Sequence, residues 1–129
     1  MRVALDIDDT LTRVPEFFSI LTTALRQAGH TVYIVSYRED RGFAEEDLRG
    51  HGIAFDELVL PSAADFYERS SEWRASAAKW KAKVCCELQI DVFFEDMPEV
   101  VNALRRHTTV FMSVLPDLGE VAYLKERTI

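Results

Sequence analysis

The sequence predicts an α/β fold in which a mainly parallel five-stranded sheet lies between two layers of helices. Strand and helix patterns alternate along the chain, and β-α units in series give parallel strands joined by right-handed crossovers. The segment Thr31–Ser36 is apolar without alternation, as expected for a strand buried on both faces. With 129 residues, 48% of them hydrophobic and 29% charged, the chain suits one core, so we expect a single domain over residues 1–129.

The individual elements can be justified in order along the chain. The first strand pattern is Val3–Asp6, and a helix pattern follows that Thr12 can cap, that has Pro15 in its first turn and that Gly29 can end. Apolar residues at three- and four-residue steps predict the buried face of this helix as Phe17, Leu21, Ala24, Leu25 and Ala28. After Thr31–Ser36 we expect helix 40–49, strand 57–60, a long helix through 73–88, strand 90–95, helix 98–106 and strand 108–114.

The charge and the cysteine content narrow the class of protein. A net charge of -7 disfavours non-specific binding to nucleic acid or to an anionic membrane. Only three apolar residues separate Met1-Arg2 from Asp6, and no apolar stretch approaches the length that spans a membrane, so we expect a cytoplasmic protein without a signal peptide. Cys85 and Cys86 are adjacent, which is neither a redox motif nor a metal-binding spacing, so we expect buried or half-buried reduced thiols.

Polar side chains follow several of the predicted strands, where parallel strands bring their carboxyl ends to one edge of the sheet. These segments are Asp6–Thr10, Ser36–Arg38, Pro61-Ser62 and Glu95-Asp96. Acidic groups thus arrive from two strands and a hydroxyl group from a third. Carboxylates packed this closely repel one another unless a cation lies between them, and an all-oxygen set of ligands suits Mg²⁺. The sequence therefore predicts a magnesium site at this edge.

These residues resemble the motifs of the haloacid dehalogenase-like (HAD) superfamily of phosphohydrolases. Asp6-Ile7-Asp8-Asp9-Thr10 resembles its first motif, Asp-x-Asp-x-Thr, and Ser36 after the second strand resembles its second. A lysine before the fourth strand would be the third motif, and Glu95-Asp96 resembles the fourth. The resemblance covers nearly the whole chain and implies a three-layer Rossmann-like domain with strand order 5-4-1-2-3.

The resemblance also implies a reaction. Asp6 would attack the phosphorus of a phosphate ester and form an aspartyl phosphate, which water then hydrolyses. Asp8 would act as general acid and then as base, and its side chain lies on the same side of an extended chain as that of Asp6. The cation, Mg²⁺, would be held by the side chains of Asp6 and Asp96 and by the backbone carbonyl of Asp8. Asp9 points the other way and is as readily explained as a turn residue.

The remaining positions of the motifs would contact the substrate. Ser36 would hydrogen-bond a phosphoryl oxygen, and Thr10 would order the loop around that group. Arg38 stands where relatives with a Thr-Gly-Arg motif carry arginine, although Tyr37 replaces the glycine. A contact of Arg38 with the substrate phosphate and a structural salt bridge are both open.

The lysine can be chosen by geometry, because Lys79, Lys81 and Lys83 all lie on the long helix before the fourth strand. The strand from 91 to 95 advances about 13 Å at about 3.3 Å per residue, which corresponds to about nine helical residues counted back from Leu88. At about 100° per residue, Lys81 lies nearest the apolar stripe of this helix. We therefore expect Lys81 at the site, with Phe66, Tyr67 or Trp73 near its mouth.

Chain length bears on the substrate, because neither insertion point of the family leaves room for a cap domain. A capless form leaves its site open, so it takes bulky or macromolecular phosphoesters, such as nucleic-acid ends, or a neighbouring copy in a homo-oligomer covers it. The predicted function is a Mg²⁺-dependent phosphomonoesterase acting on a nucleotide or another phosphorylated metabolite. The alternative is a non-catalytic phosphate-binding module. A receiver domain fits poorly, because the third strand ends at Leu60-Pro61-Ser62 without the required aspartate.

Overall fold

The computed structural model describes residues 1–66, 72–104 and 107–113. Within these ranges the strands are β1 (Arg2–Leu5), β2 (Thr31–Val35), β3 (Glu57–Val59), β4 (Val92–Glu95) and β5 (Thr109–Met112). The helices are η1 (Ile7–Leu11), α1 (Pro15–Gln27), α2 (Arg41–Gly50), α3 (Trp73–Glu87) and α4 (Pro98–Ala103). Residue Tyr67, the predicted end of the fourth helix at Arg106, Val114 of the fifth strand and the tail from Pro116 lie outside the described residues.

The sheet confirms the predicted fold class. All four strand pairs are parallel, and the order β3-β2-β1-β4-β5 is the predicted order read from the other edge. β1 lies in the centre, where Leu5 is in register with Ile34 of β2 and with Phe94 of β4. The strands therefore end nearly level, and the Asp6 amide donates to the Phe94 carbonyl 3.0 Å away. This register brings the residues after β1, β2 and β4 to the same edge.

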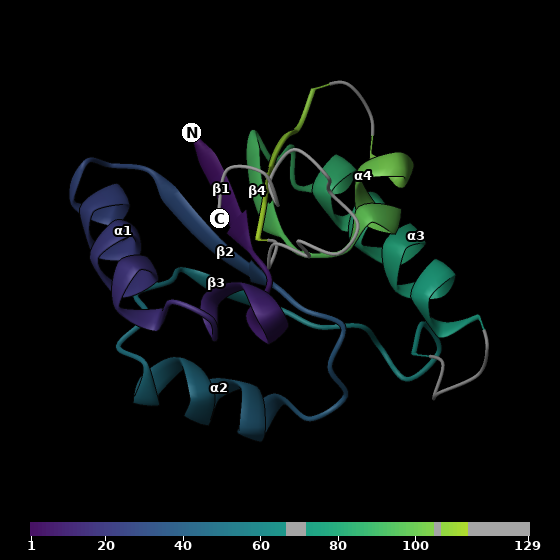
Figure 1. Ribbon diagram of the computed structural model, residues 1–129, viewed down its shortest axis with the longest axis horizontal. Helices are drawn as coiled ribbons and strands as arrows, with labels where there is room; N and C mark the ends of the chain where they lie inside the picture. Colours follow the sequence, from purple (N-terminus) through teal and green to yellow (C-terminus); the bar gives the residue numbers. More distant parts are fainter. Residues whose placement is uncertain (67–71, 105–106, 114–129) are drawn as a thin grey trace, which may run out of the picture.

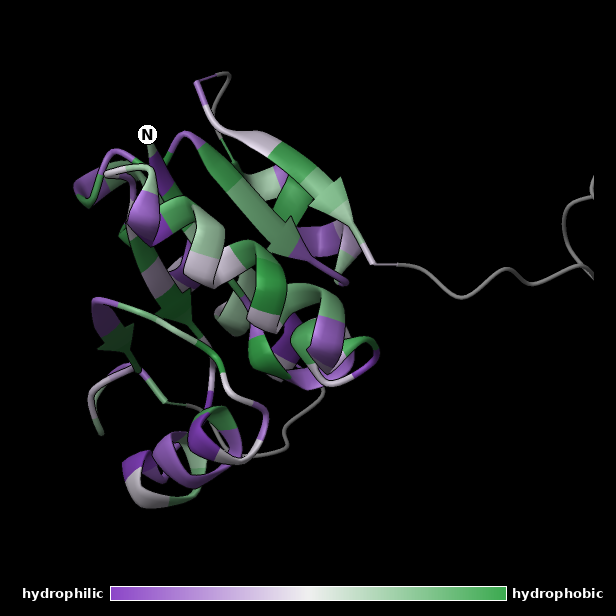
Figure 2. Ribbon diagram, turned by 90° about the vertical axis from the view of Figure 1, so that its left-hand side faces the viewer, coloured by the Kyte–Doolittle hydropathy of each residue, from purple (hydrophilic) through white to green (hydrophobic). Residues whose placement is uncertain are grey.

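Helices cover both faces of the sheet, which gives three layers (Figure 1). One core contains residues of β1, β2, α1 and α2, and the other contains residues of β2, β4, α3 and α4. Figure 2 shows the strands coloured mainly as hydrophobic, as expected for a parallel sheet buried on both sides. The edge at which the strands end lies between the two helical layers (Figure 1).

The buried face of α1 differs from the prediction. Leu21 and Leu25 are partly buried and pack against the core, but Phe17, Ala24 and Ala28 are exposed. Phe18 and Thr22 are buried, whereas Phe17 is 53% exposed. Phe18 packs edge to face on Phe94, with ring centroids 5.4 Å apart, and the Thr22 hydroxyl donates to the Phe18 carbonyl. Because a threonine can be buried once its hydroxyl is paired, the apolar pattern alone pointed to the wrong phase. The predicted cap was also wrong, since no side chain caps α1 and Thr12 accepts from the Asp9 amide instead.

The burial of side chains also bears on the expectations for the two cysteines and for Trp73. Of the cysteines, Cys85 is buried in the core and Cys86 is exposed, so the expectation of burial is wrong for Cys86. Trp73, expected near the mouth of the site, is 37% exposed. No helix within the described ranges is long and apolar enough to cross a membrane.

Candidate active site

The loop after β1 turns the acidic motif so that its members face different ways. Asp6 is 3% exposed, while the Asp9 side chain is 69% exposed. Asp8 keeps extended backbone angles (φ -68°, ψ 130°), and Asp9 adopts a left-handed conformation with φ 57°. Asparagine and aspartate tolerate this conformation better than other side chains. The turn buries Asp6 at the end of β1 and directs Asp9 to solvent, in agreement with the interpretation of Asp9 as a turn residue.

Asp6, Lys81 and Glu95 form a buried ionic cluster. Lys81 reaches from α3 and is 2% exposed; its Nζ lies 3.2 Å from Asp6 Oδ1 and 2.8 Å from Glu95 Oε2. Glu95, at the end of β4, is fully buried, and its Oε1 accepts hydrogen bonds from the backbone amides of Asp96 and Met97. Lys81 therefore lies at the predicted edge of the sheet. Lys79 and Lys83, which the helical geometry disfavoured, are exposed.

Burial dominates the protonation behaviour of this cluster. Burial raises the pKa of Asp6 well above its usual value; Lys81 opposes this shift, and the Glu95 and Asp96 carboxyls reinforce it. Burial lowers the pKa of Lys81, but Asp6 and Glu95 outweigh that effect and raise it overall. Lys81 is therefore a charged ammonium group at neutral pH, and it faces more carboxyl groups than it can neutralise.

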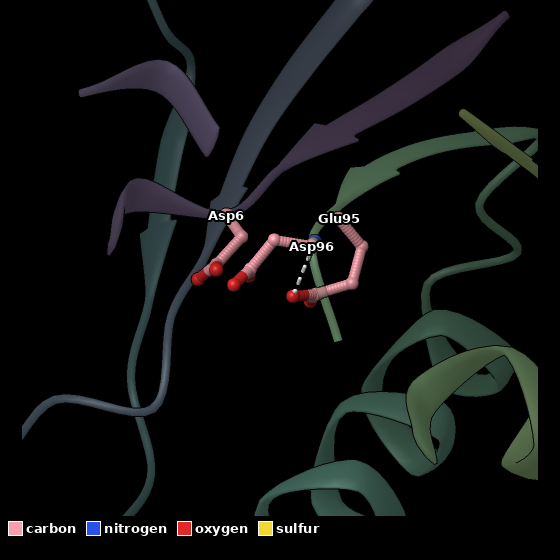
Figure 3. A group of neighbouring side chains, drawn as sticks. All are labelled: Asp6, Glu95 and Asp96. Carbon is pink, nitrogen blue, oxygen red and sulfur yellow. Dashed lines mark hydrogen bonds between the residues drawn. The ribbon is translucent and has the colours of Figure 1, made fainter. Parts of the chain in front are cut away.

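The carboxyl groups form a candidate cation site (Figure 3). Oxygen atoms of Asp6, Glu95 and Asp96 lie within 4.8 Å of one another at the ends of β1 and β4. Both Glu95 oxygens are already engaged, one by Lys81 and the other by two backbone amides. Asp6 and Asp96, which the motif resemblance names as metal ligands, are therefore the better candidates. An all-oxygen donor set with excess negative charge fits Mg²⁺.

A small cavity of about 130 Å³ opens beside the cluster. It is lined by Asp6, Asp8, Asp9, Ser36, Tyr37, Trp73, Arg74, Lys81, Asp96 and Met97. The Ser36 hydroxyl is buried and has no hydrogen-bond partner among the described residues. A buried hydroxyl group without a partner is costly, so a ligand that accepts or donates a hydrogen bond there is expected. The Thr10 hydroxyl is also buried without a described partner, but Thr10 belongs to the loop and not to the described cavity wall.

Asp8 and Arg38 form a separate pair. Arg38 Nη2 and Nε donate to the two oxygens of Asp8 at 2.7 and 2.9 Å, and Arg38 Nη1 donates to Asp47 on α2 at 2.6 Å. These carboxylates raise the pKa of Arg38 above its already high value, chiefly through the hydrogen bonds to Asp8. Asp8 thus lines the cavity while its carboxylate is held by Arg38. Of the two interpretations of Arg38, the structure contains the salt bridge.

Sequence reasoning missed some residues of the cavity wall and the role of Glu95. Arg74 lies seven residues before Lys81, a spacing that places both on one face of α3, but the motif resemblance calls only for a lysine on this helix. Its Nε donates to Glu99 at 2.7 Å, and this pairing raises the pKa of Arg74. Phe66, expected near the mouth, stacks on Tyr37 with ring centroids 5.1 Å apart. The motif resemblance named Glu95 without a partner, and the structure pairs it with Lys81.

Comparisons with known proteins show the fold and leave the activity open. No family model and no curated protein matches the chain. A chain of the Pnkp1/Rnl/Hen1 RNA repair complex aligns with TM-score 0.64 and 20% identity over 86% of this chain and 42% of that one. A glycosyltransferase from Rickettsia africae ESF-5 aligns with TM-score 0.57 and 12% identity over 97% of this chain and 32% of that one.

A third similar structure is a core domain from Streptococcus pneumoniae TIGR4, provisionally assigned to a phosphoglycolate phosphatase. It aligns with TM-score 0.48 and 12% identity over 98% of this chain and 95% of that one. The chain spans less than half of the RNA repair chain and about a third of the glycosyltransferase. At 20% identity or less, the similarities to the RNA repair chain and the glycosyltransferase establish a shared fold alone, and such folds carry many activities. Membership of the HAD superfamily stays a prediction from the motifs.

Proposed function

We propose that this chain is a Mg²⁺-dependent phosphomonoester hydrolase that acts through an aspartyl phosphate on Asp6. The observation that carries the proposal is the combination found in one small cavity. A buried carboxylate, Asp6, contacts a buried ammonium group, Lys81, and the buried hydroxyl of Ser36 has no partner in the described chain. A phosphoryl group supplies the negative charge for Lys81 and the acceptor oxygens for Ser36.

In the proposed reaction an Asp6 oxygen attacks phosphorus, and the bond between phosphorus and the ester oxygen breaks. The leaving oxygen takes a proton from the Asp8 carboxyl, and water then attacks the phosphorus of the aspartyl phosphate while Asp8 takes its proton. The bond between phosphorus and Asp6 breaks, so inorganic phosphate is released and the free Asp6 carboxylate is regenerated. Lys81 and Ser36 bind oxygens of the transferring group and fix it in line with Asp6. When bound by Asp6, Asp96 and the Asp8 carbonyl, Mg²⁺ would neutralise negative charge on those oxygens.

Glu95 has a positioning role in this scheme. Its carboxylate binds Lys81 on one side and the backbone amides after β4 on the other. It thereby holds the lysine on the side of the cavity where Asp6 lies and fixes the backbone that carries Asp96. Arg38 likewise anchors Asp8, and proton transfer requires the Asp8 carboxyl to turn from Arg38 toward the leaving oxygen.

The test of the proposal is a panel of phosphoesters assayed with and without Mg²⁺. Because the RNA repair complex shares the fold, the panel should contain oligonucleotides with 3′- and 5′-phosphates beside nucleotides and sugar phosphates. Asp6→Asn should abolish turnover. Glu16→Gln is the control, because it makes the same change from carboxylate to amide at an exposed residue of α1 that is not part of the described cavity wall. It should retain activity.

Two results would contradict the proposal. One is the absence of turnover for every phosphoester with Mg²⁺, and the other is an Asp6→Asn variant as active as Glu16→Gln. Thermal stabilisation by phosphate or by nucleotides without turnover would instead favour the alternative, a phosphate-binding module on the same fold.

A further inference from the structure

The first turn of α3 brings an aromatic and a cationic side chain to the wall of the cavity. Trp73 is 37% exposed, and Arg74 follows it directly with a side chain that is 51% exposed. The Arg74 guanidinium lies 5.5 Å from the centre of the Trp73 ring. Both residues line the same cavity as Asp6, Ser36 and Lys81. The proposed reaction assigns no role to either of them.

The size of the cavity separates the reacting group from the rest of a substrate. Its volume of about 130 Å³ lies well below the roughly 300–1,000 Å³ of pockets that enclose a whole small-molecule ligand. This space suits a phosphoryl group with its oxygens and is too small for a nucleoside or a sugar as well. The leaving group must therefore lie at the mouth, where the exposed surfaces of Trp73 and Arg74 are available to it.

The charges on the cavity wall point to an anionic leaving group. Two cations line the described wall, and Lys81 is enclosed by Asp6 and Glu95. Arg74 is paired with Glu99 across a solvent-exposed contact, since the Glu99 side chain is 39% exposed. Exposed ion pairs of this kind contribute little and exchange readily. A phosphate group offers the same guanidinium a bidentate, charge-assisted contact, so Arg74 can exchange Glu99 for a phosphate.

The aromatic surface points to a planar group. The indole of Trp73 and the phenol ring of Tyr37 both line the cavity, and Tyr37 is held in place by Phe66 and Trp80. Nucleic-acid bases stack on such side chains whatever their sequence, and arginine beside the ring adds to the attraction. A planar surface next to an available guanidinium therefore matches a base with a neighbouring phosphate.

We propose that Trp73 and Arg74 bind the leaving group, and that this group is a nucleotide carrying a phosphate besides the reacting one. The base stacks on Trp73, and the further phosphate replaces Glu99 on Arg74. The substrate class is then a phosphorylated end of a short nucleic-acid chain or a nucleoside bisphosphate. This inference rests on the proposed phosphatase function and adds a substrate class to it.

Kinetics on two substrates test the proposal. A 3′-phosphorylated dinucleotide contains the base and the second phosphate, whereas glycerol 2-phosphate has neither. We expect Trp73→Ala and Arg74→Ala each to lower kcat/KM for the dinucleotide by about tenfold, mainly through KM, with glycerol phosphate changed less than twofold. Trp73→Phe should recover most of the loss. Lys79→Ala, which removes an exposed cation from the same helix, should change neither substrate.

Equal losses for both substrates would overturn the proposal, because Trp73 and Arg74 would then act on the fold or on the phosphoryl site. Unchanged kinetics for the dinucleotide in both alanine variants would overturn it as well. A tyrosine phosphopeptide should be turned over less efficiently than the dinucleotide. If the peptide is preferred and its turnover depends on Trp73, the assignment to nucleotides is wrong.

A binding measurement separates this proposal from the reaction itself. The dephosphorylated dinucleotide can be titrated into the Asp6→Asn protein by calorimetry. Binding that weakens about tenfold in Trp73→Ala and Arg74→Ala on that background supports the nucleotide site even if no phosphoester is turned over. Absence of binding at millimolar concentration, together with turnover of glycerol phosphate, overturns the nucleotide site and leaves the phosphatase proposal standing.

Discussion

Replacing Lys81 by methionine should destabilise the protein strongly, because it removes the positive member of a buried ionic cluster. Lys81 is 2% exposed and lies 2.8 Å from Glu95, which is fully buried, and 3.2 Å from Asp6. Methionine fills a similar volume, so the loss is chiefly electrostatic. Breaking one side of a buried pair costs about 3–5 kcal/mol. At about 4 °C per kcal/mol for a domain of this size, Tm should fall by about 12–20 °C.

The pH dependence of this loss has a defined sign. Burial already raises the pKa values of Asp6 and Glu95, and removal of Lys81 takes away the charge that opposes the shift. A carboxyl group with a raised pKa binds more protons in the folded state, so stability falls as pH rises from the unfolded to the folded pKa. The difference in Tm between Lys81→Met and the unaltered protein should therefore be smaller at pH 5 than at pH 8. Lys81→Met/Glu95→Gln should recover part of the loss, since it removes one unpaired charge.

The assay is urea unfolding followed by tryptophan fluorescence, with Lys79→Met as the matched variant. Lys79 is exposed on the same helix, and its replacement should change the free energy of unfolding by less than about 0.5 kcal/mol. If the free energies of unfolding of Lys81→Met and Lys79→Met differ by less than about 0.5 kcal/mol, the cluster does not lie in a low-dielectric environment. A loss that is independent of pH would refute the role assigned to proton uptake.

Three other predictions follow from the site and its surroundings. Because burial raises the pKa of Asp6, protons compete with Mg²⁺ for its carboxylate. The rise in Tm on adding Mg²⁺ should therefore be larger at pH 8 than at pH 5. An equal rise at both pH values would count against a cation on Asp6. Burial raises the pKa of the Cys85 thiol to about 12. A thiol reagent at pH 8 should therefore modify Cys86 alone in the folded protein and both cysteines in urea. Cys86→Ala should remove the reaction of the folded protein. A lysine at position 38 cannot donate to both Asp8 oxygens as Arg38 does, so Arg38→Lys should lower kcat by about tenfold to a hundredfold. The same substitution at an exposed arginine elsewhere should leave kcat unchanged.

The strand topology could be predicted from the sequence because each element carries its own pattern. Uninterrupted apolar strands indicated a parallel sheet, and the register of parallel strands then brought Asp6, Ser36 and Asp96 to one edge. The choice of Lys81 followed from the helical repeat and the length of a strand, both of which are local quantities. These features depend on few assumptions about distant contacts.

The contacts of Asp8 and Arg38 could not be predicted in the same way. An extended chain would place the Asp8 side chain beside that of Asp6, but the left-handed residue Asp9 turns the loop, and Arg38 captures the carboxylate. The outcome depends on a loop conformation and on an arginine 30 residues away. The exposure of Phe17 has a similar origin, since the phase of α1 is set by packing on Phe94 across the sheet.

The charge balance of the cluster distinguishes a functional site from a structural ion pair. A structural pair is stable when each buried charge has one partner, and Lys81 with Glu95 alone would meet that condition. Asp6 and Asp96 add carboxyl groups beyond this balance. Burial raises the pKa of Asp6 and the neighbouring carboxyl groups reinforce the shift, so an ionised Asp6 is costly to the fold. The buried Ser36 hydroxyl, without a partner in the described chain, adds a second uncompensated group to the same cavity. A cation would neutralise the surplus carboxyl groups, and a phosphoryl oxygen would accept a hydrogen bond from Ser36. Both features therefore point to the ligands of the proposed reaction.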